Sequence, residues 1–250
     1  MGMPITVEIV DGYAEEKSKV MEEVFDYFTY VDKTFSIYKE DSEINRINRK
    51  EIGEKDYSND MKTVFELSKK TQAETGGFFN ILTPEGSYDP SGLVKGWSIY
   101  NTANIISKLG YKDFYVDAGG DIEARGKNSK GEAWSVGIRN PFSRDKNQIV
   151  KTVFIIDCGM ATSGTYLRGQ HIYNPHIGHA PLCDVVSITV IGPNVYEADR
   201  FATAVFAMGS DGINFIEKLP GFEGYSIDAR GIGTETSGFK KFTKKYENNR

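Results

Sequence analysis

Hydrophobic residues recur at helical spacing in three long stretches of the chain. Within residues 15–35, apolar side chains fall three and four positions apart, with Val20 and Val24 among them. The same period occurs at about 60–74 and again at about 90–109. Because a helix repeats every 3.6 residues, this spacing places the apolar side chains on one face. The pattern therefore predicts an amphipathic helix over each stretch.

Runs of β-branched and aromatic residues predict strands, most of them in the second half of the chain. The strands do not alternate regularly with the helices, so a doubly wound parallel sheet is not expected. No linker rich in Pro, Gly or Ser divides the chain. We therefore expect an α+β fold, a single domain over residues 1–250 with a largely antiparallel sheet packed with helices. The expected strands are 4–10, 113–119, 133–139, 152–157, 185–192 and about 224–228.

The segment ADRFATAVFAMG, residues 198–209, predicts a helix that is buried on all sides. Asp199 and Thr203 interrupt its apolar character and, at i and i+4, project from the same side. Burying an unpaired carboxylate costs several kcal/mol or more, so Asp199 is expected to have a partner. Capping the helix or pairing with Arg200 is the structural alternative to a functional role.

Composition excludes several classes of protein. A formal net charge of −5 over 250 residues argues against a nucleic-acid partner, and the basic cluster at 240–245 is interpreted as a solvated helix end or frayed tail. The two cysteines, Cys158 and Cys183, are too few for a disulfide framework or a four-cysteine zinc site. No signal-peptide core opens the sequence and no apolar run could span a bilayer. We therefore expect a cytoplasmic protein without a membrane anchor.

The segment SYDPSGLVKGW, residues 87–97, has features of a helix start. Asp89 before Pro90 is typical of an N-cap followed by proline at the first helical position. Lys95 lies one turn further on, between two glycines that allow close backbone access. A lysine over a helix N-terminus is suited to binding an anion.

Two glycine-containing segments each allow two interpretations. In YVDAGGDI, residues 115–122, the glycine pair either brings the backbone close to a ligand or forms a tight turn with Asp121 as a turn residue. GMATSGTYLRG, residues 159–169, is expected to be a loop of small residues and hydroxyls. That loop either lines a ligand cleft or only connects two elements.

All three histidines fall within HIYNPHIGHA, residues 171–180. Their spacing matches no familiar zinc pattern. His176 and His179 are interpreted as surface or structural residues. His171, near the hydroxyl-rich segment, is the better candidate for chemistry.

Together these segments resemble the ApbE-type FAD:protein FMN transferases. The motifs FSIYKEDSEINRIN, GGFFN, DPSGLVKGW, VDAGGDI, WSVGIRNP, ATSGTY, HIYNP and ADRFATAVFAMG occur in the family's order over about residues 2–209. The resemblance implies an enzyme that binds FAD and, with Mg²⁺, transfers FMN to a threonine or serine hydroxyl of a client protein, releasing AMP. A metal-dependent FAD pyrophosphatase and a non-catalytic FAD-binding protein are the alternatives.

The resemblance also assigns roles to residues. Asp199, Thr203 and the backbone carbonyl of Gly92 would hold Mg²⁺, a hard ion that prefers oxygen ligands. Asp199 and His171 would be catalytic, with His171 as general base for the attacking hydroxyl or water. The residues expected against FAD are Tyr38, Phe78, Phe79, Asn80, Asp89, Lys95 and Ile172.

The chain departs from the family pattern at three positions. Asn80 and Asn174 each replace a usual aspartate, and Ile177 replaces a usual threonine. The segment between GGFFN and DPSG is also shorter than is usual in the family.

Overall fold

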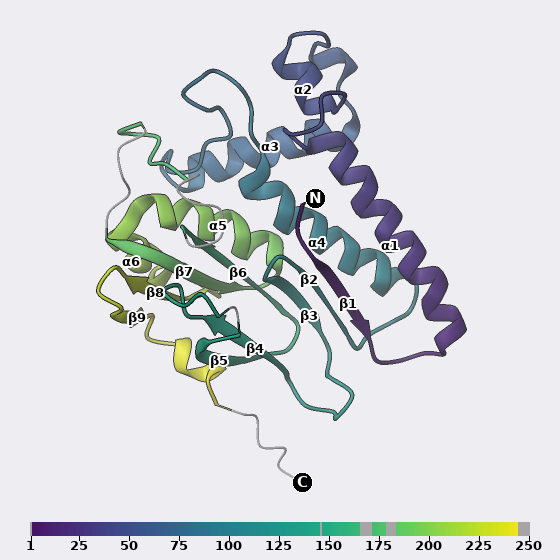
Figure 1. Ribbon diagram of the computed structural model, residues 1–250, viewed down its shortest axis with the longest axis vertical. Coiled ribbons are helices and arrows are strands. Elements are labelled where there is room, and N and C mark those ends of the chain that lie inside the picture. Colours follow the sequence, from purple (N-terminus) through teal and green to yellow (C-terminus); the bar gives the residue numbers. More distant parts are fainter. Residues whose placement is uncertain (1, 146, 166–171, 179–183, 245–250) are drawn as a thin grey trace.

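An antiparallel sheet of seven strands forms the centre of the molecule, in the order β1-β2-β3-β6-β7-β8-β9 (Figure 1). The computed structural model describes residues 2–145, 147–165, 172–178 and 184–244. The expected α+β fold with a largely antiparallel sheet is confirmed. The strands of this sheet are β1 (Ile5–Ile9), β2 (Phe114–Ala118), β3 (Asp121–Arg125), β6 (Cys158–Gly164), β7 (Val185–Gly192), β8 (Glu223–Asp228) and β9 (Gly233–Glu235).

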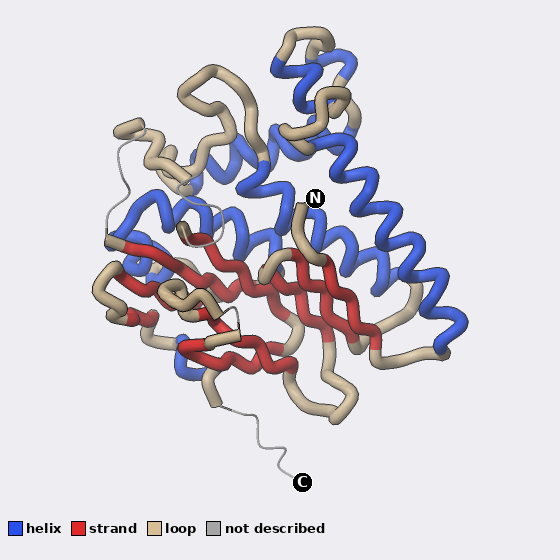
Figure 2. Tube along the Cα trace, viewed as in Figure 1, coloured by secondary structure: helices blue, strands red, loops and turns tan. Residues whose placement is uncertain are grey.

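Helices cover one face of this sheet and a β-hairpin covers the other. Apolar side chains of α1 and α4 pack on β2, and those of α5 and α6 pack on β6 and β7. On the opposite face, β4 (Trp134–Arg139) and β5 (Ile149–Ile155) pair with each other and pack over β3 and β6. Figure 2 shows the helices gathered on one side of the strands. The helices are α1 (Ala14–Phe35), α2 (Glu43–Asn48), α3 (Asn59–Glu74), α4 (Ser91–Lys108), α5 (Val195–Met208) and α6 (Gly212–Glu217), with short 3₁₀ turns η1 (Glu54–Asp56), η2 (Gly209–Asp211) and η3 (Phe239–Phe242).

A further hydrophobic cluster lies beyond the sheet, where the end of α1, α2, α3 and the start of α4 meet. Phe79, from the segment between α3 and α4, is buried in this cluster. The cluster therefore fixes the segment that leads into α4. None of the helices that the structure describes is long and apolar enough to cross a lipid bilayer.

The prediction of a loop at 159–169 is wrong for its first part, because residues 159–164 belong to strand β6. Its small residues have a packing reason. A Cβ added to Gly159 would lie 1.9 Å from the backbone nitrogen of Val195, at the start of α5. The strand therefore needs glycine where α5 approaches it, and the small side chains that suggested a loop instead permit helix-on-sheet contact.

The turn before β3 contains Gly119 and Gly120, whose φ angles of 66° and 97° favour glycine. The interpretation of Asp121 as a turn residue is wrong. Asp121 is the first residue of β3, where it pairs with Ala118 of β2.

Candidate active site

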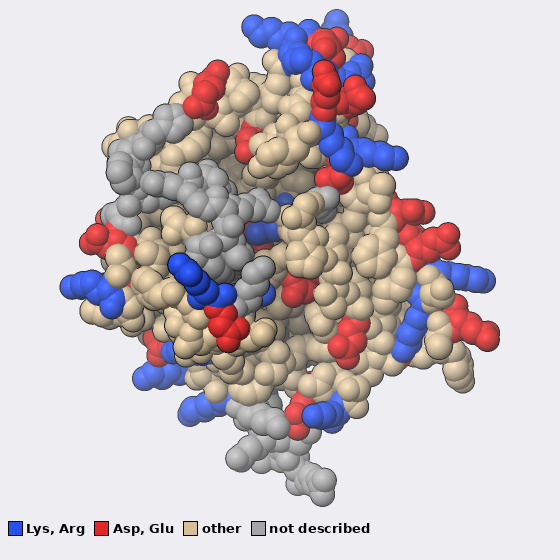
Figure 3. Space-filling view, viewed as in Figure 1, with Lys and Arg blue, Asp and Glu red and all other residues tan. Residues whose placement is uncertain are grey.

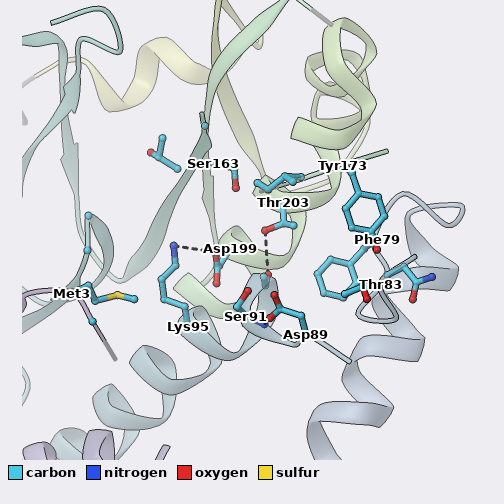
Figure 4. Close-up of a pocket in the computed structure, with 18 of the residues that line it drawn as sticks. Met3, Phe79, Thr83, Asp89, Ser91, Lys95, Ser163, Tyr173, Asp199 and Thr203 are labelled. Atoms are coloured by element: carbon cyan, nitrogen blue, oxygen red, sulfur yellow. Dashed lines mark hydrogen bonds and ion pairs between the residues drawn. The ribbon is translucent and has the colours of Figure 1, made fainter. Parts of the chain in front are cut away.

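A cavity of about 740 Å³ opens where α4 begins, beside α5, the β2–β3 turn and β6. Figure 3 shows this face of the molecule hollowed near its centre, with basic and acidic side chains inside the hollow. In Figure 4, Lys95, Asp199 and Thr203 lie centrally, with Phe79 and Tyr173 on one side and Met3 on the other. The predicted site residues that line the cavity are Phe78, Phe79, Asn80, Asp89, Gly92, Lys95, Ile172, Asp199 and Thr203.

Asp199 is 2% exposed, and its partners come from α4 and from the Asp121 side chain of β3. Its Oδ2 accepts a hydrogen bond of 2.7 Å from the backbone N–H of Gly96, and its Oδ1 lies 3.7 Å from Nζ of Lys95. Burial raises the pKa of Asp199 to about 8, while the Lys95 ammonium opposes that rise. The carboxylate is thus placed at a site where a cation would stabilise its charged form.

The structural alternative for Asp199 does not describe its contacts. The N-cap of α5 is Asn194, whose side chain accepts from the backbone N–H of Glu197. Arg200 pairs instead with Glu197 and with Glu74 at the end of α3. Arg200 therefore ties α5 to α3, and Asp199 is left facing α4.

Gly96 permits the close approach of α4 and α5. A Cβ at this position would lie 2.5 Å from Cβ of Asp199 and 2.7 Å from the carbonyl oxygen of Val195. Real Cβ atoms do not approach other atoms so closely, so a side chain here would push the helices apart. The glycine also brings its own N–H within reach of Asp199.

Thr203 lies one turn after Asp199 and faces the start of α4. Its hydroxyl donates a hydrogen bond of 3.2 Å to the backbone carbonyl of Gly92. A carboxylate, a hydroxyl and a carbonyl thus present oxygen atoms to one cavity, and oxygen is the ligand that Mg²⁺ prefers. Within the described residues no cluster of three or more His, Cys, Asp or Glu side chains is suited to a metal, so a cation here would depend on this mixed oxygen set.

Lys95 has a closer partner than Asp199. Its Nζ lies 2.6 Å from Oδ2 of Asp121, a carboxylate that is 1% exposed. The other oxygen of Asp121 accepts the backbone N–H of Thr162 at 3.0 Å. Sequence reasoning missed Asp121, because only the pairing of β3 with β6 brings it beneath α4.

The segment before α4 supplies the aromatic wall of the cavity. The ring of Phe78 packs edge-on against His176, with centroids 4.6 Å apart. Phe79 is 3% exposed, so most of its ring belongs to the core. Tyr173, which was not predicted, lines the cavity and donates from its hydroxyl to the carbonyl of Leu82 at 3.1 Å.

Helix α4 begins one residue later than expected. Pro90 occupies the N-cap position and Ser91 is the first helical residue. Asp89 therefore precedes the cap, and its Oδ1 accepts the backbone N–H of Ser91 at 2.9 Å. Asp89 still stabilises the helix start while lining the cavity.

The sequence pattern of the ApbE family matches residues 1–86 and 82–226, which together make up most of the chain. The chain belongs to the ApbE family. It is 28% identical over 175 residues to the FAD:protein FMN transferase of Haemophilus influenzae, covering 66% of this chain and 51% of that protein. It is 32% identical over 136 residues to the enzyme of the same name from Vibrio cholerae, covering 51% of this chain and 40% of that protein. The chain therefore spans about half the length of the curated relatives that it matches.

Solved structures share the fold over nearly the whole chain. The flavin transferase ApbE from Vibrio cholerae superposes with a TM-score of 0.83 at 22% identity, covering 97% of this chain and 96% of that one. The ApbE protein from Thermotoga maritima gives a TM-score of 0.82 at 18% identity, covering 97% of this chain and 99% of that one. The antiparallel sheet and its helical layer are thus an ApbE fold.

One residue assigned by resemblance to the ApbE family, Tyr38, is not brought into the cavity. Tyr38 lies between α1 and α2, is 90% exposed and is absent from the cavity wall. Its assignment to the FAD pocket is not supported by this position. His171 and His179 lie outside the described residues. His176 is held by Phe78 and by a contact of 3.1 Å between its Nε2 and the carbonyl of Gly76, as a structural histidine would be.

Two of the three positions that depart from the ApbE pattern have local structural roles. Oδ1 of Asn80 accepts the backbone N–H of Leu82 at 2.9 Å, and Oδ1 of Asn174 accepts that of His176 at 2.9 Å. Both asparagines thus stabilise turns beside the cavity. Ile177 is 61% exposed.

Proposed function

We propose that this protein is a Mg²⁺-dependent FAD:protein FMN transferase, which passes FMN from FAD to a threonine or serine hydroxyl of a client protein and releases AMP. The observation that carries the proposal is the convergence of Asp199, Thr203 and the Gly92 carbonyl beside Lys95 in one cavity. The relatives from Haemophilus influenzae and Vibrio cholerae are FAD:protein FMN transferases, which supports transfer of FMN from FAD to a protein.

The residues present fit a magnesium ion. All three donors are oxygens, and two of them, Oγ1 of Thr203 and the carbonyl of Gly92, lie 3.2 Å apart. Neighbouring oxygens around octahedral Mg²⁺ lie about 3 Å apart. Asp199 supplies the negative charge. A bound Mg²⁺ would neutralise charge on the pyrophosphate as its phosphorus–oxygen bond breaks.

Lys95 and the start of α4 would bind the pyrophosphate of FAD. The ammonium lines the cavity one turn into α4, where the helix N-terminus also favours anions. Phe78 and Tyr173 offer aromatic rings beside the same cavity. Ring stacking contributes about 0.5–1.5 kcal/mol for each pair.

His171 is proposed as the general base. It would accept the proton of the client hydroxyl as that oxygen bonds to the phosphorus of the FMN half. The bond to the AMP phosphate breaks in the same step, and AMP leaves with the bridging oxygen. An imidazole with an ordinary pKa near 6.5 suits such proton transfer.

The test is to incubate the protein with FAD and Mg²⁺, with and without an acceptor protein that the Vibrio cholerae relative flavinylates. AMP together with protein-bound flavin is the expected result. The same acceptor protein with its flavin-accepting threonine or serine replaced by alanine should stay unlabelled. AMP with free FMN, independent of acceptor, would identify a pyrophosphatase. FAD binding without AMP would identify a non-catalytic FAD-binding protein.

Lys95→Met is expected to weaken FAD binding by about tenfold or more, since a hydrogen bond to a charged group contributes about 1.5–3 kcal/mol. Titration of flavin fluorescence measures the dissociation constant. Lys108→Met, at an exposed lysine in the last turn of the same helix, is the control and should bind FAD as the wild type does. Equal affinity in wild type and Lys95→Met would remove Lys95 from the FAD site.

A further inference from the structure

Asp121 has no part in the proposed reaction, yet it is among the most buried charged residues near the cavity. Its side chain is 1% exposed, and it lies on the central sheet directly beneath Lys95. A buried carboxylate is costly unless it is paired and hydrogen-bonded. Its position beside two predicted site residues therefore calls for a functional explanation.

The contacts of Asp121 fix it independently of the helices. It opens β3, and its Oδ1 accepts the backbone N–H of Thr162 in β6 at 3.0 Å. Its Oδ2 is then directed at the Lys95 ammonium, 2.6 Å away. The central sheet thus provides a rigid anchor for a side chain that projects from α4.

Lys95 lies between two carboxylates at unequal distances. Its Nζ is 2.6 Å from Oδ2 of Asp121 but 3.7 Å from Oδ1 of Asp199. Figure 4 marks the pair of Lys95 and Asp199 with a dashed line. Asp199 is held through its other oxygen by the N–H of Gly96. The ammonium is therefore drawn toward the sheet, and one oxygen of Asp199 is not in direct contact with it.

We infer that Asp121 is a positioning residue that keeps the Lys95 ammonium off Asp199, so that Asp199 is able to bind a divalent cation. This inference rests on the proposed function, which places Mg²⁺ at Asp199. An ammonium and a divalent cation compete for the same carboxylate oxygen. When Asp199 is ionised, two carboxylates and one ammonium leave a net negative charge for the cation to neutralise.

Loss of the Asp121 charge would change this arrangement. Asp199 would then be the remaining carboxylate within ion-pair distance of Lys95 among the described residues. The ammonium would pair with it directly and occupy the oxygen that the metal needs. Asp121 therefore acts on the metal through Lys95, and not as a ligand.

A double-mutant cycle tests this inference, with Mg²⁺ binding as the readout. The proteins are the wild type, Asp121→Asn, Lys95→Met and the double variant, each saturated with FAD. Calorimetric titration with MgCl₂ and the Mg²⁺ dependence of Tm both report affinity. We expect Asp121→Asn to weaken Mg²⁺ binding about tenfold or more in the wild-type background and less than about threefold in the Lys95→Met background, because coupled residues are not additive.

Equal losses in both backgrounds would overturn the inference, since Asp121 would then act on the metal by its charge alone. No loss in either background would overturn it as well. The proposed function fails by a different result, which is the absence of Mg²⁺ binding in the wild type, or wild-type binding in Asp199→Asn.

Folding is checked by circular dichroism and by Tm in EDTA. Asparagine keeps an acceptor for the N–H of Thr162, so Asp121→Asn is expected to fold. Asp121→Ser removes the charge with a smaller side chain, and it takes the place of the asparagine variant in the cycle if that variant is unfolded. The same two outcomes then decide the inference.

Discussion

Asp199→Asn is expected to abolish both the stabilisation of this protein by Mg²⁺ in the presence of FAD and the release of AMP. The amide keeps the shape of the side chain but removes the charge that a divalent cation would neutralise. A ligand at 100 times its Kd stabilises the folded state by about 2.7 kcal/mol, and this gain should disappear. Melting curves with Mg²⁺ and with EDTA, together with AMP quantification, measure both effects.

The EDTA arm is the control for this variant. Burial raises the pKa of Asp199 to about 8, above its ordinary value of 3.8, so the charged form is disfavoured in the folded protein. Because the folded protein holds this proton more tightly, Asp199 contributes to the free energy of unfolding. That contribution is fully present below pH 3.8 and is lost as the pH rises to about 8. In EDTA at neutral pH, Asp199→Asn should therefore be at least as stable as the wild type. A variant that loses the same stability with and without Mg²⁺ would indicate a structural role alone.

Thr203→Val provides a graded comparison for the same site. It removes one hydroxyl oxygen while keeping the β-branched shape, and a neutral hydroxyl contributes less than a carboxylate to a hard cation. The Mg²⁺-dependent stabilisation should therefore be reduced and not abolished.

Gly96→Ala is expected to lower the free energy of unfolding by about 1–3 kcal/mol or more, the range for overpacked interiors. Alanine is otherwise favoured over glycine in a helix by about 1 kcal/mol, so the sign of the change reports the clash. The added Cβ would lie 2.5 Å from Cβ of Asp199 and 2.7 Å from the carbonyl oxygen of Val195. Denaturant unfolding measures the stability, and Mg²⁺ titration should show weaker binding because Asp199 is displaced.

Gly53→Ala is the matched control for this substitution. Gly53 has no atom within 4 Å of an added Cβ, and its φ of −102° is accessible to alanine. Its stability should stay within about 0.5 kcal/mol of the wild type. A Gly96→Ala protein as stable as Gly53→Ala would show that α4 and α5 separate at little cost.

Hydrophobic period determined where the long helices form. The pattern in 15–35 predicts α1 (Ala14–Phe35), and that in 60–74 predicts α3 (Asn59–Glu74), each to within one residue. This works because helix periodicity is a property of neighbouring residues and needs no distant partner. The spacing of Asp199 and Thr203 on one side of a helix was predictable for the same reason.

The walls of the site were less predictable, because they depend on approach between elements. Small residues in 159–164 suggested a loop. Position 159 requires glycine for another reason, because the start of α5 packs directly against it and leaves no room for a side chain. Composition alone does not distinguish these causes. Tyr38 carries a family assignment by its place in a motif, but its side chain is 90% exposed and outside the cavity.

The sequence by itself determined the helix periods, the α+β class and the shared face of Asp199 and Thr203, all of which follow from local spacing. Only the tertiary structure decided which charges meet. The side chains of Asp121 and Lys95 lie 2.6 Å apart because β3 pairs with β6 beneath α4. Gly96 and Asp199 are 103 residues apart in the sequence, and they meet because α4 and α5 pack with no side chain at position 96 between them. Non-local pairing of this kind arises from packing of the whole chain, and no window of the sequence contains it.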